Sequence, residues 1–147
     1  MSINDIRQTI DNKLLGVIRI VTGLIFLITG FLQLFIPKFT EAWLGQLIHA
    51  GIPLVTLNFF FVPFVEIVLG LLLLKGLFTR FFSLLIFPIM FVAIYVHIFV
   101  KDASLFPLQP KLPILPIILL IKAIILLRYG AGSWSDDLRW SKKNPTT

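Results

Sequence analysis

The sequence predicts an all-α integral membrane protein, a four-helix bundle that forms a single membrane domain over residues 1–147. Apolar residues make up 58% of the chain and charged residues only 14%. A soluble domain carries about 25% charged residues, so this chain has too few charges to cover a surface that faces water. Its mean hydropathy of +0.99 indicates that most of its surface faces lipid.

Four apolar segments predict the membrane spans. A bilayer core about 30 Å thick requires about 20 apolar residues in a helix. The segments that approach this length cover residues 14–36, 55–74, 81–100 and 112–127, the last being the shortest. Only six residues (75–80) separate the second segment from the third, and so short a connection forces an antiparallel hairpin.

The first long connection contains an interfacial segment, residues 38–50. Phe39, Trp43, Leu47 and Ala50 fall on one helical face, while Glu41 lies on another. This pattern predicts a short amphipathic helix on the membrane surface, between the first and second spans.

The second long connection has prolines at positions 107, 110, 113 and 116. We interpret it as a stiff, extended return segment whose last prolines lie in the first turn of the fourth helix, where proline is tolerated. The alternative is a polyproline recognition motif for a partner.

The net charge of +6 does not indicate nucleic-acid binding, because the basic residues collect at helix ends. With both termini inside, eight lie on the cytoplasmic side: Arg7, Lys13, Lys75, Arg80, Arg128, Arg139, Lys142 and Lys143. The outer connections hold three: Lys38, Lys101 and Lys111. This bias predicts an N-in/C-in topology, with a cytoplasmic tail over residues 129–147 in a multi-pass protein of the inner (plasma) membrane.

A first group of polar residues lies in the inner half of the predicted spans. By helical rise, Arg19, Glu66 and Lys122 lie roughly 7–13 Å from the inner ends of their helices. A glycine every seventh residue in the first span predicts a packing face that also turns Arg19 inward. We therefore expect Arg19 and Glu66 to form a buried ion pair, with Lys122 as a third member or extended to the inner surface. The cluster either fixes helix register or belongs to a proton or substrate route.

A second group lies near the outer face. Gln33, Asn58 and His97 come out roughly 25–28 Å from the inner ends of their helices, and His49 lies in the segment above them. The group is either interfacial polarity or a site for a ligand with carbonyl oxygens, such as a quinone. Haem ligation by His49 and His97 is less favoured, because His49 lies in a connection. The chain has no cysteine, and we expect no metal site.

Several short motifs occur in a characteristic order. They are Arg19, Gly23, Phe26 and Gly30, then Gly51-Ile52-Pro53, Glu66 and Gly70, then Gly76 and Thr79-Arg80, and last a closing Gly130-Ala131-Gly132-Ser133-Trp134-Ser135-Asp136-Asp137. Over residues 14–137 this order resembles the DoxX-like family of small four-helix bacterial membrane proteins. One departure is Gln33, near which that family often carries a lysine.

The resemblance implies a membrane subunit of a redox (oxidoreductase) system. Relatives are linked to a thiosulfate:quinone oxidoreductase and to a membrane complex with superoxide dismutase and a sulfurtransferase. It thus implies a quinone as cofactor and a soluble or membrane redox protein as partner. Two alternatives remain. One is a scaffold that docks a soluble partner through the basic residues 139–143. The other is a small transporter that uses Arg19, Glu66 and Lys122 as a homo-oligomer.

Overall fold

The computed structural model describes residues 3–145, so the predicted domain's end positions, 1–2 and 146–147, lie outside it. Every regular element within residues 3–145 is a helix, and these residues form no strand. The elements are α1 (Ile3–Arg7), α2 (Lys13–Phe35), α3 (Pro37–His49), α4 (Val55–Lys75), α5 (Thr79–Phe99), the 3-10 turn η1 (Ala103–Leu105), α6 (Ile114–Tyr129) and α7 (Asp136–Lys143).

Three of the predicted spans are confirmed as helices long and apolar enough to cross a membrane: α2, α4 and α5. Their bounds lie within two residues of those expected from the sequence. Helix α6 has 16 residues, and at 1.5 Å per residue it is about 24 Å long, shorter than a hydrocarbon core of about 30 Å. The fourth membrane span therefore stays a prediction.

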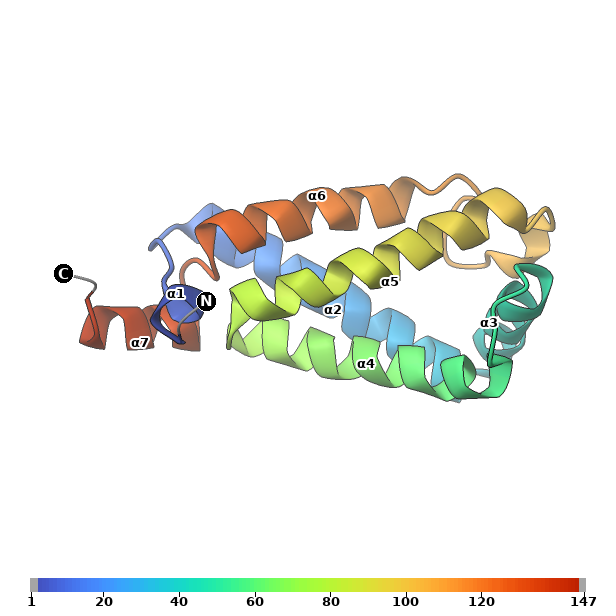
Figure 1. Ribbon diagram of the computed structural model, residues 1–147, viewed down its shortest axis with the longest axis horizontal. Coiled ribbons are helices and arrows are strands. Elements are labelled where there is room, and N and C mark those ends of the chain that lie inside the picture. The colour runs from blue at the N-terminus through green and yellow to red at the C-terminus, as the bar shows by residue number, and fades with distance from the viewer. Residues whose placement is uncertain (1–2, 146–147) are drawn as a thin grey trace.

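The long helices are arranged as two pairs, α2 with α4 and α5 with α6 (Figure 1). Helix α5 leaves α4 at a tight hairpin around Gly76 and then runs obliquely away from it. Both chain termini lie at the hairpin end, together with α1 and α7, and we call this the terminal end. Helix α3 crosses the opposite end, which we call the α3 end.

The glycine face of α2 packs directly on α4, as its spacing predicted. A Cβ on Gly30 would lie 2.6 Å from the carbonyl oxygen of Pro63, and one on Gly23 would lie 2.9 Å from that of Gly70. Each added Cβ would clash with a backbone atom and not with a movable side chain. Because Gly23 and Gly30 have no side chain, α2 and α4 can approach this closely.

Between the two pairs, a cluster of buried apolar side chains fills the part nearer the terminal end. Its members are Phe26, Leu69, Leu73, Ile86, Met90, Leu119, Ala123 and Leu126. Many large apolar side chains instead point outward, among them Phe60, Phe64 and Phe91, each about 60% exposed. An outer surface of this kind suits lipid and would be unusual in water.

Candidate functional site

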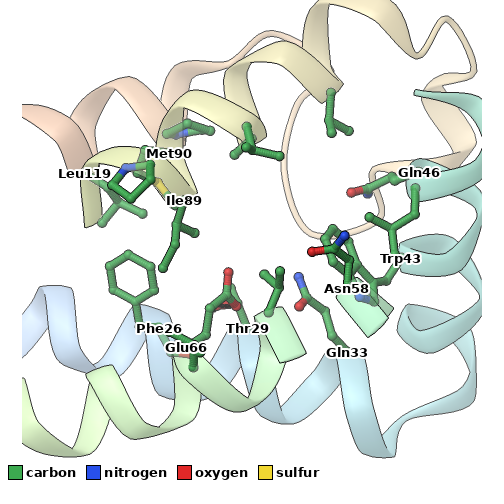
Figure 2. A pocket seen from close by; sticks show the side chains of 18 of the residues that line it. Phe26, Thr29, Gln33, Trp43, Gln46, Asn58, Glu66, Ile89, Met90 and Leu119 are labelled. Carbon is green, nitrogen blue, oxygen red and sulfur yellow. Dashed lines mark hydrogen bonds between the residues drawn. The ribbon is translucent and has the colours of Figure 1, made fainter. Parts of the chain in front are cut away.

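A cavity of about 590 Å³ lies between the two helix pairs, toward the α3 end (Figure 2). At one end Phe26, Ile89, Met90 and Leu119 form an apolar wall. Over the rest of the lining, polar side chains from α2, α3, α4, α5 and the connection that precedes α6 are set among further apolar ones. The cavity therefore depends on the whole arrangement of helices and not on one local motif.

The divergence of α5 from α4 gives the cavity a side opening. Phe61 on α4, and Leu85 and Val92 on α5, line the cavity and are 58%, 37% and 45% exposed. Exposed side chains on two neighbouring helices that also line the cavity indicate that it opens between these helices. Because these outer faces are apolar, the opening leads toward lipid.

Three residues of the predicted outer layer are brought together here. Gln33, Asn58 and His97 all line the cavity. The Asn58 side chain donates to the carbonyl oxygen of Pro53 at 2.8 Å, so it also supports the turn before α4. The fourth predicted residue, His49, lies apart: it is exposed, does not line the cavity, and its Nδ1 lies 2.8 Å from the carbonyl oxygen of Gly45.

Sequence reasoning missed two glutamines of this site. Gln46 of α3 lines the cavity and donates to the carbonyl oxygen of Leu105. Gln109 lines it from the proline-containing connection. Helical periodicity cannot predict where a residue of an irregular connection lies, so nothing in the sequence indicated that Gln109 lines the cavity. Gln46 lies off the apolar face predicted for residues 38–50, so that face gave no indication that Gln46 lines the cavity.

Three residues that line this site carry buried polar atoms without partners. Gln33 Oε1, His97 Nε2 and Gln109 Oε1 are buried and make no hydrogen bond with the described residues. The other such atoms in residues 3–145, Thr79 Oγ1 and Arg80 Nε, belong to residues at the terminal end. Leaving a buried polar group without a partner costs about 1–3 kcal/mol. Three unpartnered atoms around one cavity indicate that a bound molecule or water completes them.

The His97 ring is held firmly in place. It is 4% exposed, its Nδ1 lies 2.7 Å from the carbonyl oxygen of Ala93, and its centroid lies 4.5 Å from that of Phe106. The Ala93 contact occupies one ring nitrogen, and the other, Nε2, has no partner. His97 therefore presents a single polar atom in a fixed direction.

Glu66 also lines the cavity, whereas Arg19, its predicted ion-pair partner, does not. Its carboxyl is buried, and its hydrogen-bond partner is the hydroxyl of Thr29, 3.1 Å from Oε2. No ion pair joins Glu66 to Arg19 within residues 3–145, where the ion pairs are Arg7–Asp137, Arg139–Asp136 and Lys142–Asp11. Thr29 shares a helical face with Phe26 and Gln33, so its spacing could have predicted that it points into the bundle.

Arg19 has a different set of partners. Its guanidinium donates to the carbonyl oxygens of Leu73 and Leu74 at the end of α4, and to three carbonyls of the closing segment, those of Ala131, Ser133 and Trp134. The last carbonyls of a helix have no N–H partner within the helix, and the guanidinium of the buried Arg19 donates hydrogen bonds to two of them in α4. The predicted Arg19–Glu66 pair is therefore replaced by a clamp between α2, α4 and the closing segment.

Lys122 does not join either group. It is half-buried on α6, and no hydrogen bond or ion pair connects it to Arg19 or Glu66. The three charged residues predicted as one cluster thus occupy three separate environments.

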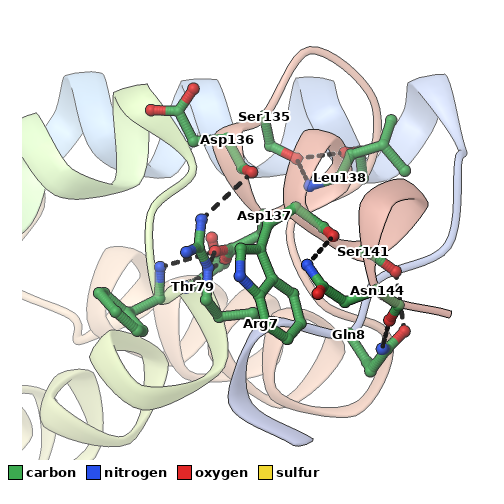
Figure 3. Close-up of polar contacts among 12 residues, drawn as sticks. Arg7, Gln8, Thr79, Ser135, Asp136, Asp137, Leu138, Ser141 and Asn144 are labelled. Carbon is green, nitrogen blue, oxygen red and sulfur yellow. Dashed lines mark hydrogen bonds and ion pairs between the residues drawn. The ribbon is translucent and has the colours of Figure 1, made fainter. Parts of the chain in front are cut away.

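Asp137 of α7, like Arg19, is a buried charged residue that joins separate segments through hydrogen bonds, and the sequence predicted no partner for it (Figure 3). It is 1% exposed and accepts hydrogen bonds from the backbone N–H groups of Phe78 and Thr79, at 3.0 and 2.8 Å. Arg7 of α1 donates to the same carboxylate at 3.1 Å. Phe78 caps α5 without a side-chain hydrogen bond of its own, so Asp137 caps that helix from 59 residues away.

A proline attaches α3 to the bundle. Pro63 lies inside α4 and has no N–H, which leaves the carbonyl of Phe59, four residues earlier, without its helical partner. The indole N–H of Trp43 donates to this oxygen at 3.2 Å. Trp43 also lines the cavity, so the same contact fixes α3 over the α3 end and shapes the cavity wall.

Three apolar spanning helices around a laterally open cavity define a multi-pass membrane protein. The DoxX family model matches residues 14–98, which covers more than half of the chain. The chain belongs to the DoxX family. The match covers α2 to α5 and ends before α6 and the closing segment. A search of curated proteins found no match, and a search of solved structures found none.

Proposed function

We propose that this protein binds a lipid-soluble, quinone-type ligand in the cavity and acts as the membrane subunit of a redox system. The observation that carries the proposal is the set of unpartnered buried atoms on Gln33, His97 and Gln109, three residues that line a mostly apolar cavity. A quinone-type headgroup is a flat apolar ring with a polar oxygen at each side; O–H groups of its reduced form could donate to these atoms, and the NH2 groups of the glutamines could donate to the carbonyl oxygens of its oxidised form.

The size of the cavity supports the same ligand class. Ligand pockets commonly measure about 300–1,000 Å³ and place a few polar groups among apolar walls. The cavity measures about 590 Å³, which accommodates a substituted ring. The opening between α4 and α5 gives a hydrophobic tail a route into lipid, so a quinone would enter from the bilayer.

The proposal includes a topology. We propose that α6 is the fourth span, that both termini are cytoplasmic in the inner membrane, and that α3 lies at the outer interface. The counts of basic residues on the two sides support this orientation. A redox partner would then meet the protein either in the membrane or at the cytoplasmic terminal end.

Native mass spectrometry of protein extracted gently from its own membrane tests the ligand. We expect a bound mass of the quinone class on the wild-type chain. Ala93→Phe adds bulk to a cavity-lining position and is expected to remove that mass. Ile98→Phe, at a residue 60% exposed on the outer surface, is the matched control and should retain it. A chain that carries only phospholipid, or only a co-purifying protein, contradicts the ligand and favours a scaffold.

Glu66 supports a second candidate function, a small transporter that acts as an oligomer. A carboxyl group inside a membrane cavity with one hydroxyl partner is typical of ion and substrate routes. Glu66→Gln keeps the contact with Thr29 and removes the titratable group. Loss of flux in reconstituted vesicles with unchanged thermal stability would support transport, and unchanged flux would exclude this role for Glu66.

A further inference from the structure

We infer that the cavity binds the reduced, hydroxyl-bearing form of its ligand in preference to the oxidised, carbonyl-bearing form, and that His97 makes the selection. The inference rests on the proposed function and specifies it further. It follows from the hydrogen-bonding role that the surrounding structure imposes on one ring nitrogen.

The contact with Ala93 fixes the tautomer of His97. A carbonyl oxygen only accepts hydrogen bonds, so the nitrogen 2.7 Å away, Nδ1, carries the hydrogen. In a neutral imidazole the other nitrogen is then an acceptor. Nε2 is the buried atom without a partner, and it requires a donor from the ligand.

The two redox forms of a quinone differ in this property. A quinol presents O–H groups that can donate to Nε2. A quinone presents carbonyl oxygens, whose lone pairs would face the lone pair of Nε2. The glutamines do not discriminate in this way, because each amide has an acceptor and a donor and satisfies either form. Among the three residues with unpartnered atoms, the preference therefore depends on His97.

The neighbouring residues keep this arrangement in place. The ring of Phe106 packs against that of His97 in a tilted arrangement, with 4.5 Å between the centroids. His97 is also 4% exposed, so its ring has little room to turn. No Asp or Glu carboxylate pairs with His97 within residues 3–145. A positive charge on the ring would thus be both buried and unpaired, which favours the neutral form.

The two histidines of the chain provide a matched pair of variants. His49 makes the same contact between Nδ1 and the carbonyl four residues earlier, at 2.8 Å, but it is exposed outside the cavity. His97→Phe keeps a ring against Phe106 and removes Nε2. His49→Phe makes the same change where no ligand is expected.

The experiment is anaerobic calorimetric titration of the protein in lipid nanodiscs with three short-chain benzoquinone probes: the quinol, the quinone, and the quinol dimethyl ether. One net hydrogen bond corresponds to about tenfold in affinity, so we expect the quinol to bind about tenfold more tightly than the quinone. The dimethyl ether has the shape of the quinol but no O–H group, and it should bind as weakly as the quinone. His97→Phe should reduce the ratio to about one, and His49→Phe should leave it unchanged.

The outcomes separate this inference from the function on which it rests. Equal binding of quinol and quinone to the wild-type protein overturns the selection by His97 and leaves the ligand class intact. Binding of none of the three probes overturns the proposed function itself. Retention of the ratio in His97→Phe assigns the selection to another residue and contradicts the inference. The comparison of quinol with its ether uses the wild-type chain alone, so it remains decisive if His97→Phe does not fold.

Discussion

At the terminal end, buried charged groups have full sets of partners: Arg19 donates to five backbone carbonyls, and Asp137 accepts from two amides and Arg7. At the α3 end, Gln33 and His97 each leave a buried polar atom without a partner. Thr79 Oγ1 and Arg80 Nε at the terminal end also lack a partner. The contrast is therefore between Arg19 and Asp137, whose hydrogen bonds the protein itself completes, and the cavity-lining Gln33 and His97, whose hydrogen bonds it does not. A completed set indicates a role in folding, and an incomplete set indicates a role in binding.

The largest expected effect comes from breaking the completed set. Arg19→Met keeps the apolar stem but removes the hydrogen-bond donor shared by five carbonyls, of which Leu73 O retains the N–H of Gly76. We expect a loss of about 3–5 kcal/mol in unfolding free energy, because each buried acceptor left without a partner costs about 1–3 kcal/mol. Thermal unfolding in detergent measures it. The control is Arg139→Met at a pair whose side chains are 82% and 44% exposed, where the loss should be about 0.5 kcal/mol or less. Equal losses in the two variants would contradict the clamp.

A second variant tests the packing of α2 on α4, which both ends share. In Gly30→Ala the new Cβ would lie 2.6 Å from the backbone oxygen of Pro63, and we expect a loss of about 1–3 kcal/mol from overpacking. In Gly45→Ala, the control, the nearest atom is a terminal methyl of Leu105, which can move. That variant should be neutral or more stable, since alanine is favoured over glycine in a helix by about 1 kcal/mol. The same thermal assay decides, and a stable Gly30→Ala would refute the close approach.

The same substitution made at the two ends sharpens the comparison. Gln33→Leu removes a buried oxygen that has no partner, and we expect the unfolding free energy to stay unchanged or rise by about 1 kcal/mol. Gln8→Leu at the terminal end removes an acceptor for the Ser141 hydroxyl and a donor to the Asn144 carbonyl, and should cost about 1 kcal/mol. Chemical denaturation of both variants and of the wild type measures whether the unfolding free energy rises or falls in each. A clear loss in Gln33→Leu would show that Gln33 serves folding.

The smallest effect concerns pH. Hydrogen bonds from Lys142 and Ser133 hold the pKa of Asp11 below its usual value of 3.8. A carboxyl whose pKa is lowered by folding stabilises the protein above its unfolded pKa, and this contribution disappears as pH falls through the folded pKa. Stability should therefore decrease slightly below about pH 4, and Asp11→Asn should reduce that decrease. Because Asp11 is exposed, a variant with an unchanged pH profile would show that solvent screening removes the effect.

The sequence predicted the helices well because uninterrupted apolar runs ended by polar residues specify membrane spans directly. The depth of each residue along its helix also predicted that Gln33, Asn58 and His97 lie at one level near the outer face, and all three line the cavity. The pairing of Arg19 was wrong because its partners are backbone carbonyls, which every residue carries and no pattern marks. Gln109 was missed, and the partners of Asp137 were not predicted, for a related reason. Gln109 lies in an irregular connection, and the irregular residues 130–135 position α7 with Asp137; the path of such segments depends on the folded structure.

Photoaffinity labelling with an azido-benzoquinone in native membranes, followed by peptide mapping, tests most directly whether the α3 end binds a ligand. The account predicts adducts on cavity-lining residues of α3 and α5, such as Gln46 and His97, that unlabelled quinol displaces and that Ala93→Phe abolishes. Adducts confined to lipid-facing residues such as Phe64 and Phe91, unaffected by competitor and by Ala93→Phe, would contradict it.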